Sequence, residues 1–229
     1  MVKRNLDLLR ARIADAASRA GRDPQSVRIV AAAKTQNSRI VEDAVRAGVT
    51  IIGHNYVQEA VKERPRPDEC GSFEYHMIGH LQRNKARKAV EIFDVIQTID
   101  DSATAAALDH AAHELGRRLG VLIQINLANE PQKSGVPEME ALALIQAVES
   151  LRNLKLLGLM TMPPFFDDPD AARPFFRRLR GLRDDFISRG FMISSATELS
   201  MGMTGDFEVA VEEGATLVRI GTALFGPRG

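Results

Sequence analysis

Apolar positions along the chain recur with two different spacings. Over residues 3–20, Leu6, Leu9, Ile13 and Ala17 follow one another at the spacing of a helical face. Gly21 then provides a stop. The pattern predicts a leading helix over residues 3–20.

The next segment is a largely apolar run, residues 27–33, that ends in Lys34 and Thr35. A run of about five to eight apolar residues with polar ends is typical of a strand buried on both faces of a parallel sheet. On this run alone, a lysine that leaves the sheet for solvent is the simplest interpretation of Lys34. In barrels of parallel strands, however, the carboxyl ends of the strands carry the chemistry, which makes Lys34 a candidate functional residue.

Strand and helix patterns then alternate to the end of the chain. Between the strands, Ser38 is the predicted N-cap of a helix that ends at Gly48. Further strands are predicted over residues 49–53, 74–78, 94–98, 120–126, 154–160, 191–199 and 215–220, and further helices over residues 102–116, 137–148, 169–189 and 207–213.

Eight strands that alternate with helices, without a linker or a repeat, predict a single (β/α)₈ barrel of α/β class. We expect one domain over residues 1–229, with the leading helix as an addition to the barrel. A doubly wound open sheet has the same local rhythm and is the alternative fold.

Composition restricts the function further. Thirty basic and thirty acidic residues cancel, so no overall field attracts nucleic acid, and the basic patch at residues 83–88 is interpreted as a solvated helix face. No apolar stretch approaches the roughly 18 to 20 residues that span a bilayer, and no apolar signal core follows the basic start. We expect a cytoplasmic protein that binds neither nucleic acid nor membrane. The lone Cys70 makes a cysteine metal site implausible, and we expect no metal site.

Two late segments, residues 198–204 and 219–226, combine glycines with hydroxyl groups. The loops after the last two strands of such barrels often bind phosphate, and there Gly221 allows a close approach while Ser200 and Thr222 offer hydroxyl donors. Two ordinary helix caps would explain each segment alone. A phosphate site facing Lys34 points to a phosphorylated carbonyl compound held as a Schiff base, and pyridoxal 5'-phosphate (PLP) is the obvious candidate.

Short motifs in a fixed order carry a family resemblance. They are Ala-Lys-Thr at 33–35, Gly-His-Asn-Tyr-Val-Gln-Glu at 53–59, His-Met-Ile-Gly-His-Leu-Gln-Arg-Asn-Lys at 76–85, Lys-Ser-Gly at 133–135, Gly-Leu-Met-Thr-Met-Pro at 158–163, Leu-Ser-Met-Gly-Met at 199–203 and Arg-Ile-Gly-Thr-Ala-Leu-Phe-Gly at 219–226. Almost from end to end, the chain resembles the YggS/PROSC family of PLP-binding homeostasis proteins, single-domain relatives of the barrel half of alanine racemase.

The resemblance implies a TIM barrel of the alanine racemase N-terminal type that binds PLP. It implies a Schiff base on Lys34, a phosphate held by Ser200, Gly221 and Thr222, and Arg219 directed at the pyridine nitrogen. Because a guanidinium only donates hydrogen bonds, the ring nitrogen would stay unprotonated and the ring would be a weak electron sink. A barrel arginine paired with a carboxylate is the alternative for Arg219.

Three residues near the expected site have weaker assignments. Asn55 and His76 are candidate pocket residues, although an N-cap role for Asn55 and a hydrogen-bonded structural role for His76 explain them equally well. The family usually has Glu where this chain has His54. Any charge interaction that this Glu makes near the cofactor in the family is therefore not expected in this chain.

The leading hypothesis is a monomeric protein of intracellular PLP homeostasis without catalytic activity, which buffers PLP or delivers it to PLP-dependent apoenzymes. The alternative is a PLP-dependent amino-acid racemase, which needs an acid/base group on each face of the substrate carbon. Lys34 supplies one, and neither Tyr56 nor Tyr75 is obviously placed to supply the other. We also expect no additional domain, because only three residues follow Gly226. A Schiff-base aldolase without cofactor would not need Arg219.

Overall fold

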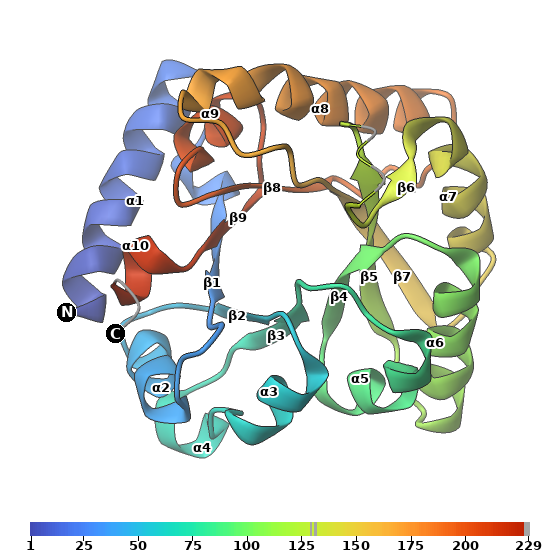
Figure 1. Ribbon diagram of the computed structural model, residues 1–229, viewed down its shortest axis with the longest axis horizontal. Coiled ribbons are helices and arrows are strands. Elements are labelled where there is room, and N and C mark those ends of the chain that lie inside the picture. The colour runs from blue at the N-terminus through green and yellow to red at the C-terminus, as the bar shows by residue number, and fades with distance from the viewer. Residues whose placement is uncertain (129, 131, 227–229) are drawn as a thin grey trace.

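Eight parallel strands close into a barrel in the computed structural model, which describes residues 1–128, 130 and 132–226 (Figure 1). Successive barrel strands are neighbours, and the ring closes where β1 pairs with β9, with Val30 opposite Arg219. The closed ring confirms the predicted barrel and excludes the open sheet. The strands are β1 (Arg28–Ala32), β2 (Ile51–His54), β3 (Glu74–Met77), β4 (Val95–Ile99), β5 (Leu119–Asn126), β7 (Leu154–Met160), β8 (Glu198–Met203) and β9 (Leu217–Ile220), while the short β6 (Val136–Pro137) pairs with the end of β5.

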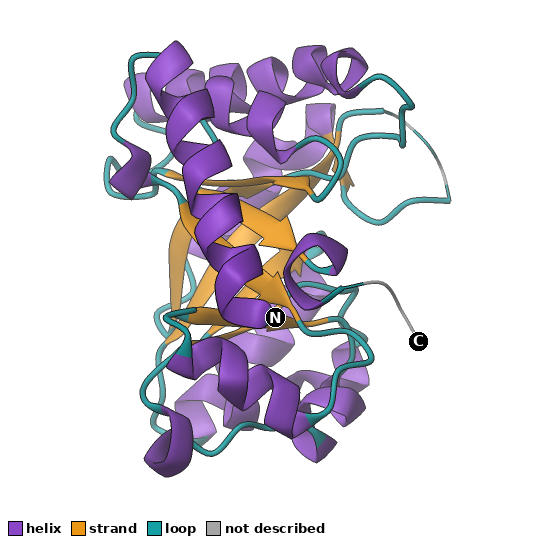
Figure 2. Cartoon of the chain, turned by 90° about the vertical axis from the view of Figure 1, so that its left-hand side faces the viewer, coloured by secondary structure: helices purple, strands orange, loops and turns teal. Residues whose placement is uncertain are grey.

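Helices form a ring outside the strands (Figure 1). The predicted leading helix is α1, which packs along α9 and α10 and crosses the side of the barrel (Figure 2). The helices are α1 (Val2–Arg19), α2 (Ser38–Arg46), α3 (Val57–Lys62), α4 (Pro67–Cys70), α5 (Ala86–Ile92), α6 (Ser102–Glu114), α7 (Ala141–Glu149), α8 (Arg173–Ser188), α9 (Phe207–Glu212) and α10 (Thr222–Phe225).

Two sequence-based boundaries are wrong. The N-cap of α2 is Asn37, whose side chain accepts a hydrogen bond from the Ile40 amide at 3.1 Å, and Ser38 is the first helical residue. The seventh barrel strand, β8, covers residues 198–203 instead of 191–199. The predicted start belongs instead to the end of α8, where the amides of Phe191 and Met192 both donate to the Phe186 carbonyl and the Met192 side chain is buried.

The barrel has a large apolar core outside the strands and a small one inside them. The outer core lies between strands and helices and contains most of the buried side chains. The inner core consists of Val30, Ile51, Ile78, Val95, Leu122, Met160 and Leu217. Because successive strand residues face opposite sides, one set of alternate positions fills the barrel and the other packs under the helices.

Charged side chains close the amino-terminal end of the barrel. Arg28, the first residue of β1, pairs with Glu198 at 2.7 Å and with Glu74 at 3.4 Å, and these carboxylates begin β8 and β3. The opposite, carboxyl-terminal end is therefore the side of the barrel that is free to hold a ligand.

His54 lies in the outer core. A Cβ on the preceding Gly53 would meet Val30 and Ile78 of the inner core at 2.9 Å, so His54 faces the other way. Its ring packs edge-on against Tyr75, with the ring centres 5.4 Å apart, and neither ring nitrogen has a hydrogen-bond partner among the described residues. Burial lowers the pKa of His54 from 6.5 to about 4, so the imidazole is neutral at pH 7.

We predict that this neutral, buried imidazole makes the protein sensitive to mild acid. In the unfolded chain His54 takes up a proton as the pH falls through 6.5, whereas in the folded chain it resists protonation until about pH 4, so stability decreases in this window. Between pH 7.5 and 5 the loss from His54 alone is about 2 kcal/mol. Denaturant titrations measure the free energy of unfolding at both pH values. Between pH 7.5 and 5 it should fall by this amount more in the wild type than in His54→Leu. A variant of the exposed His113, His113→Leu, should keep the wild-type dependence; if His54→Leu keeps it too, the imidazole is not held neutral.

Candidate functional site

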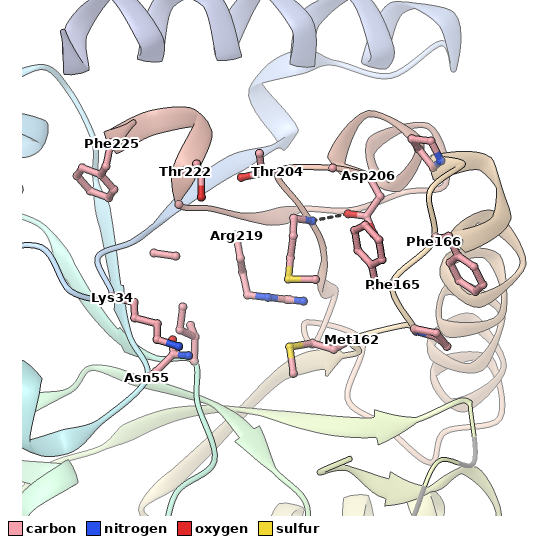
Figure 3. Close-up of a pocket in the computed structure, with 18 of the residues that line it drawn as sticks. Lys34, Asn55, Met162, Phe165, Phe166, Thr204, Asp206, Arg219, Thr222 and Phe225 are labelled. Atoms are coloured by element: carbon pink, nitrogen blue, oxygen red, sulfur yellow. Dashed lines mark hydrogen bonds between the residues drawn. The ribbon is translucent and has the colours of Figure 1, made fainter. Parts of the chain in front are cut away.

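A cavity of about 410 Å³ opens at the carboxyl-terminal end of the barrel (Figure 3). Its polar wall comes from loops that follow β1, β2, β8 and β9, and its apolar lip from the segment that follows β7. The side chains that matter for its chemistry are those of Lys34, Asn55, Thr204, Arg219 and Thr222, beside the backbone of Gly221.

Lys34 stands at the first turn after β1. The Ala33 amide donates to the Gly53 carbonyl at 2.9 Å, which extends the pairing of β1 and β2 up to the lysine. Thr35 then has φ 65°, a left-handed conformation that is unfavourable for a β-branched residue and turns the chain sharply. Lys34 is half-buried, and among the described residues none forms an ion pair with its amine. An amine held in a cavity without an acidic partner is suited to condensation with a carbonyl group.

Asn55 lies beside Lys34 in the cavity (Figure 3). It is not the N-cap of α3, since that position is Tyr56. Its backbone is held by Gly79 from the loop after β3, where an added Cβ would lie 2.3 Å from the Asn55 carbonyl oxygen. The close approach of these two backbones therefore depends on glycine.

Arg219 projects from β9 into the floor of the cavity and is 4% exposed. Nη1 donates to the Ser200 hydroxyl at 2.6 Å, and Nη2 donates to the Thr161 carbonyl at 2.9 Å. Burial lowers its pKa to about 10, which still leaves the guanidinium charged at neutral pH. The alternative of a carboxylate partner does not hold, because no described carboxylate forms a salt bridge with Arg219.

The predicted phosphate residues separate into two groups. Gly221 and Thr222 line the cavity, and Thr222 is exposed. Ser200 is fully buried inside the barrel, where its hydroxyl contacts Arg219 and donates to Gln97 at 2.6 Å. The hydroxyl that stands near Thr222 at the cavity wall is that of Thr204 (Figure 3).

Thr204 is the site residue that sequence reasoning missed. It belongs to the segment 198–204 that the sequence points to, but the pattern does not show where the strand ends. Once β8 is known to end at Met203, Ser200 belongs to the strand and Thr204 to the loop at the cavity.

His76 does not line the cavity. It is 1% exposed inside the barrel, with Nδ1 2.8 Å from Gln97 and Nε2 3.0 Å from Glu74. The structure thus places it beneath the site as a hydrogen-bonded interior residue.

The rim of the cavity is apolar and partly exposed. Phe165 is 87% exposed and Met162 38% exposed, and both stand across the cavity from Lys34 (Figure 3). Nearby, the Asp206 carboxylate accepts a hydrogen bond from the Met203 amide at 2.6 Å, and burial raises the pKa of Asp206.

Neither tyrosine of the chain is at the cavity. Tyr75 is buried in the outer core, where its hydroxyl donates to the Ala60 carbonyl at 3.1 Å and burial raises its pKa. Tyr56 is 52% exposed and lies by a separate groove beside His80 and Lys85.

A family model for the N-terminal domain of alanine racemase matches residues 5–229. The chain belongs to this family. Among its curated relatives is a protein named pyridoxal phosphate homeostasis protein from Aquifex aeolicus, which is 38% identical over 95% of this chain and 94% of its own. A protein of the same name from Escherichia coli is 37% identical over 99% of this chain and 97% of its own. No helix among the described residues is long and apolar enough to cross a membrane.

Solved structures share the fold of this chain. PipY of Synechococcus elongatus, determined with PLP bound, superposes with a TM-score of 0.86, is 32% identical, and covers 99% of this chain and 100% of its own. Alanine racemase of Clostridium difficile, at 14% identity and a TM-score of 0.72, shares the fold, and the match covers 56% of that longer chain.

We predict that Gly79→Ala damages the site through Asn55. The new methyl group cannot fit against the Asn55 carbonyl without a backbone shift, and we expect a loss of about 1–3 kcal/mol in the free energy of unfolding. The matched control is Gly181→Ala in the middle of α8, where nothing lies within 4 Å of the added carbon, and where we expect a gain of up to about 1 kcal/mol. Denaturant titrations of the two variants measure both changes in the free energy of unfolding. Two small and equal changes would contradict the close approach of the Gly79 and Asn55 backbones.

Proposed function

We propose that this protein binds PLP and acts in intracellular PLP homeostasis. The observation that carries the proposal is the arrangement of one cavity: an amine on Lys34, a buried cation on Arg219, and hydroxyl groups on Thr204 and Thr222. The full-length relationship to proteins named for PLP homeostasis, and to PipY with PLP bound, supports it.

The residues fit the chemical groups of PLP. When bound, PLP supplies an aldehyde that condenses with an amine, and in this cavity the amine is that of Lys34. The hydroxyls of Thr204 and Thr222 can donate to phosphate oxygens, while Gly221 presents no side chain at the same wall. Ser200, the third phosphate residue implied by sequence, contacts Arg219 instead, so we assign its phosphate role to Thr204.

Arg219 favours storage of PLP over catalysis. Two of its nitrogens are held by protein acceptors, yet a guanidinium has five N–H groups, so it retains donors for a ligand in the cavity. At the pyridine nitrogen Arg219 would donate a hydrogen bond and would not give up a proton at neutral pH. The ring nitrogen would then stay unprotonated, which would weaken the ring as an electron sink.

A racemase has less support. It requires a second acid/base group on the face of the substrate opposite Lys34. Tyr56 and Tyr75, the two tyrosines of the chain, both lie outside the cavity. We therefore propose a carrier that acts as a monomer and releases PLP to PLP-dependent apoenzymes.

We predict that the phosphate group contributes strongly to binding. PLP should bind at least about tenfold more tightly than pyridoxal, which lacks the phosphate, and Thr204→Val and Thr222→Val should each weaken PLP binding about tenfold, since each removes a hydrogen bond to a charged group. Pyridoxal binding should be nearly unchanged in both variants. Fluorescence titration measures the affinities of the wild type and of both variants for PLP and for pyridoxal, with Thr50→Val on the exposed surface as control. Equal binding of PLP and pyridoxal would refute the proposed phosphate site.

Turnover separates the carrier from the racemase. We expect that PLP-loaded protein incubated with L-alanine keeps its optical rotation constant over hours, because neither tyrosine lies at the cavity and the Asp206 carboxylate that lines it is engaged by the Met203 amide. A PLP-dependent alanine racemase serves as the positive control. Sustained loss of rotation that disappears in Lys34→Ala would overturn the carrier proposal.

A further inference from the structure

A chain of hydrogen bonds runs through the barrel from the cavity to its closed end. From Arg219 it passes to Ser200 at 2.6 Å, to Gln97 at 2.6 Å, to His76 at 2.8 Å and to Glu74 at 3.0 Å. These residues come from β9, β8, β4 and β3, so the chain crosses the barrel interior. Ser200 and Gln97 are completely buried, and His76 is 1% exposed.

The chemistry of the groups sets the direction of every bond. Arg219 can only donate, so the Ser200 oxygen accepts and its single proton goes to Gln97 Oε1. The Gln97 amide then donates through Nε2 to His76 Nδ1, which must carry a lone pair. The remaining proton of the imidazole is on Nε2 and points at the Glu74 carboxylate.

The opposite orientation of the amide leaves polar groups unsatisfied. With Gln97 reversed, the Ser200 hydroxyl would lose its acceptor, and His76 would need a proton on Nδ1. A neutral His76 would then turn a lone pair toward the Glu74 carboxylate. Buried polar groups without partners are costly, so we infer that the direction from Arg219 to Glu74 is the favoured one.

The other support of Arg219 is also neutral, since Nη2 donates to the Thr161 carbonyl at 2.9 Å. Two acceptors, one on β8 and one directly after the end of β7, fix the plane of the guanidinium. Because neither acceptor is charged, these hydrogen bonds leave the positive charge available at the cavity floor, where the Asp206 carboxylate, which forms no salt bridge with Arg219, attracts it from a distance.

We propose that Gln97 and His76 are positioning residues that hold Arg219, through Ser200, in the orientation that binds the ring of the cofactor. This inference rests on the proposed function. It gives Ser200 and His76, two residues that the sequence points to but that do not line the cavity, a role beneath it.

The first test replaces Gln97 by methionine, which has a similar length but neither donates nor accepts strongly. We expect Gln97→Met to weaken PLP binding about tenfold, as is usual for residues that orient a binding group, and to shift the visible absorption maximum of bound PLP. The matched control is Gln124→Met on β5, another buried glutamine, which bonds to the Ser134 carbonyl at 2.9 Å and is not part of the chain to Arg219. It should lose stability and keep both the affinity and the spectrum.

The second test asks whether Gln97 acts through Ser200. Ser200→Ala should weaken PLP binding about as much as Gln97→Met does. The double variant should bind PLP as tightly as the single variant with the lower affinity, because both substitutions break the same chain of hydrogen bonds. Ser200→Thr, which keeps the hydroxyl, should restore affinity and spectrum. Additive losses, or a Gln97→Met protein with wild-type affinity and absorption, would overturn the positioning role while leaving PLP binding intact.

A third measurement needs no cofactor. In the unliganded protein, imidazole ¹⁵N shifts should show His76 as the neutral form with its proton on Nε2. A doubly protonated ring, or a proton on Nδ1, at neutral pH would contradict the direction of the hydrogen-bond chain. If the wild-type protein does not bind PLP at all, the proposed function is wrong. The proposed role of the hydrogen-bond chain in PLP binding is then wrong as well.

Discussion

The site depends on a guanidinium buried inside a barrel and held only by neutral acceptors. An isolated charge in such a place is very costly, and burial lowers the pKa of Arg219 to about 10. Hydrogen bonds to Ser200 and to the Thr161 carbonyl compensate part of this cost without cancelling the charge. The fold therefore keeps a rigid cation at the bottom of a cavity whose polar wall carries the Lys34 amine.

The two ends of the barrel have different roles. At the amino-terminal end Arg28 pairs with both Glu74 and Glu198, and these side chains close the opening. At the carboxyl-terminal end Lys34 has no acidic partner among the described residues and faces the cavity. The interior hydrogen-bond chain connects these ends, so the position of Arg219 is set by residues that never reach the ligand.

Sequence reasoning succeeded where a pattern has one structural meaning. Buried runs that end in polar residues located the barrel strands, and Lys34 stood out as a charge at the end of such a run. It failed at β8. The apolar residues Phe191 and Met192 resemble a strand start but follow the end of α8, and this hid both the true start of β8 and the different depths of Ser200 and Thr204. The outward direction of His54 follows only from the register of β2, which places Gly53 inside. This also removes His54 from the cavity, where its difference from the family's usual Glu raised a question.

The central claim is that Lys34 anchors the cofactor covalently. Reduction of the PLP-treated protein with borohydride converts a lysine Schiff base into a stable secondary amine, and peptide mass spectrometry then locates it. The account predicts one pyridoxyl phosphate group per chain, on the peptide that contains Lys34. A label on another lysine, such as Lys85 or Lys133, with Lys34 unmodified would contradict it.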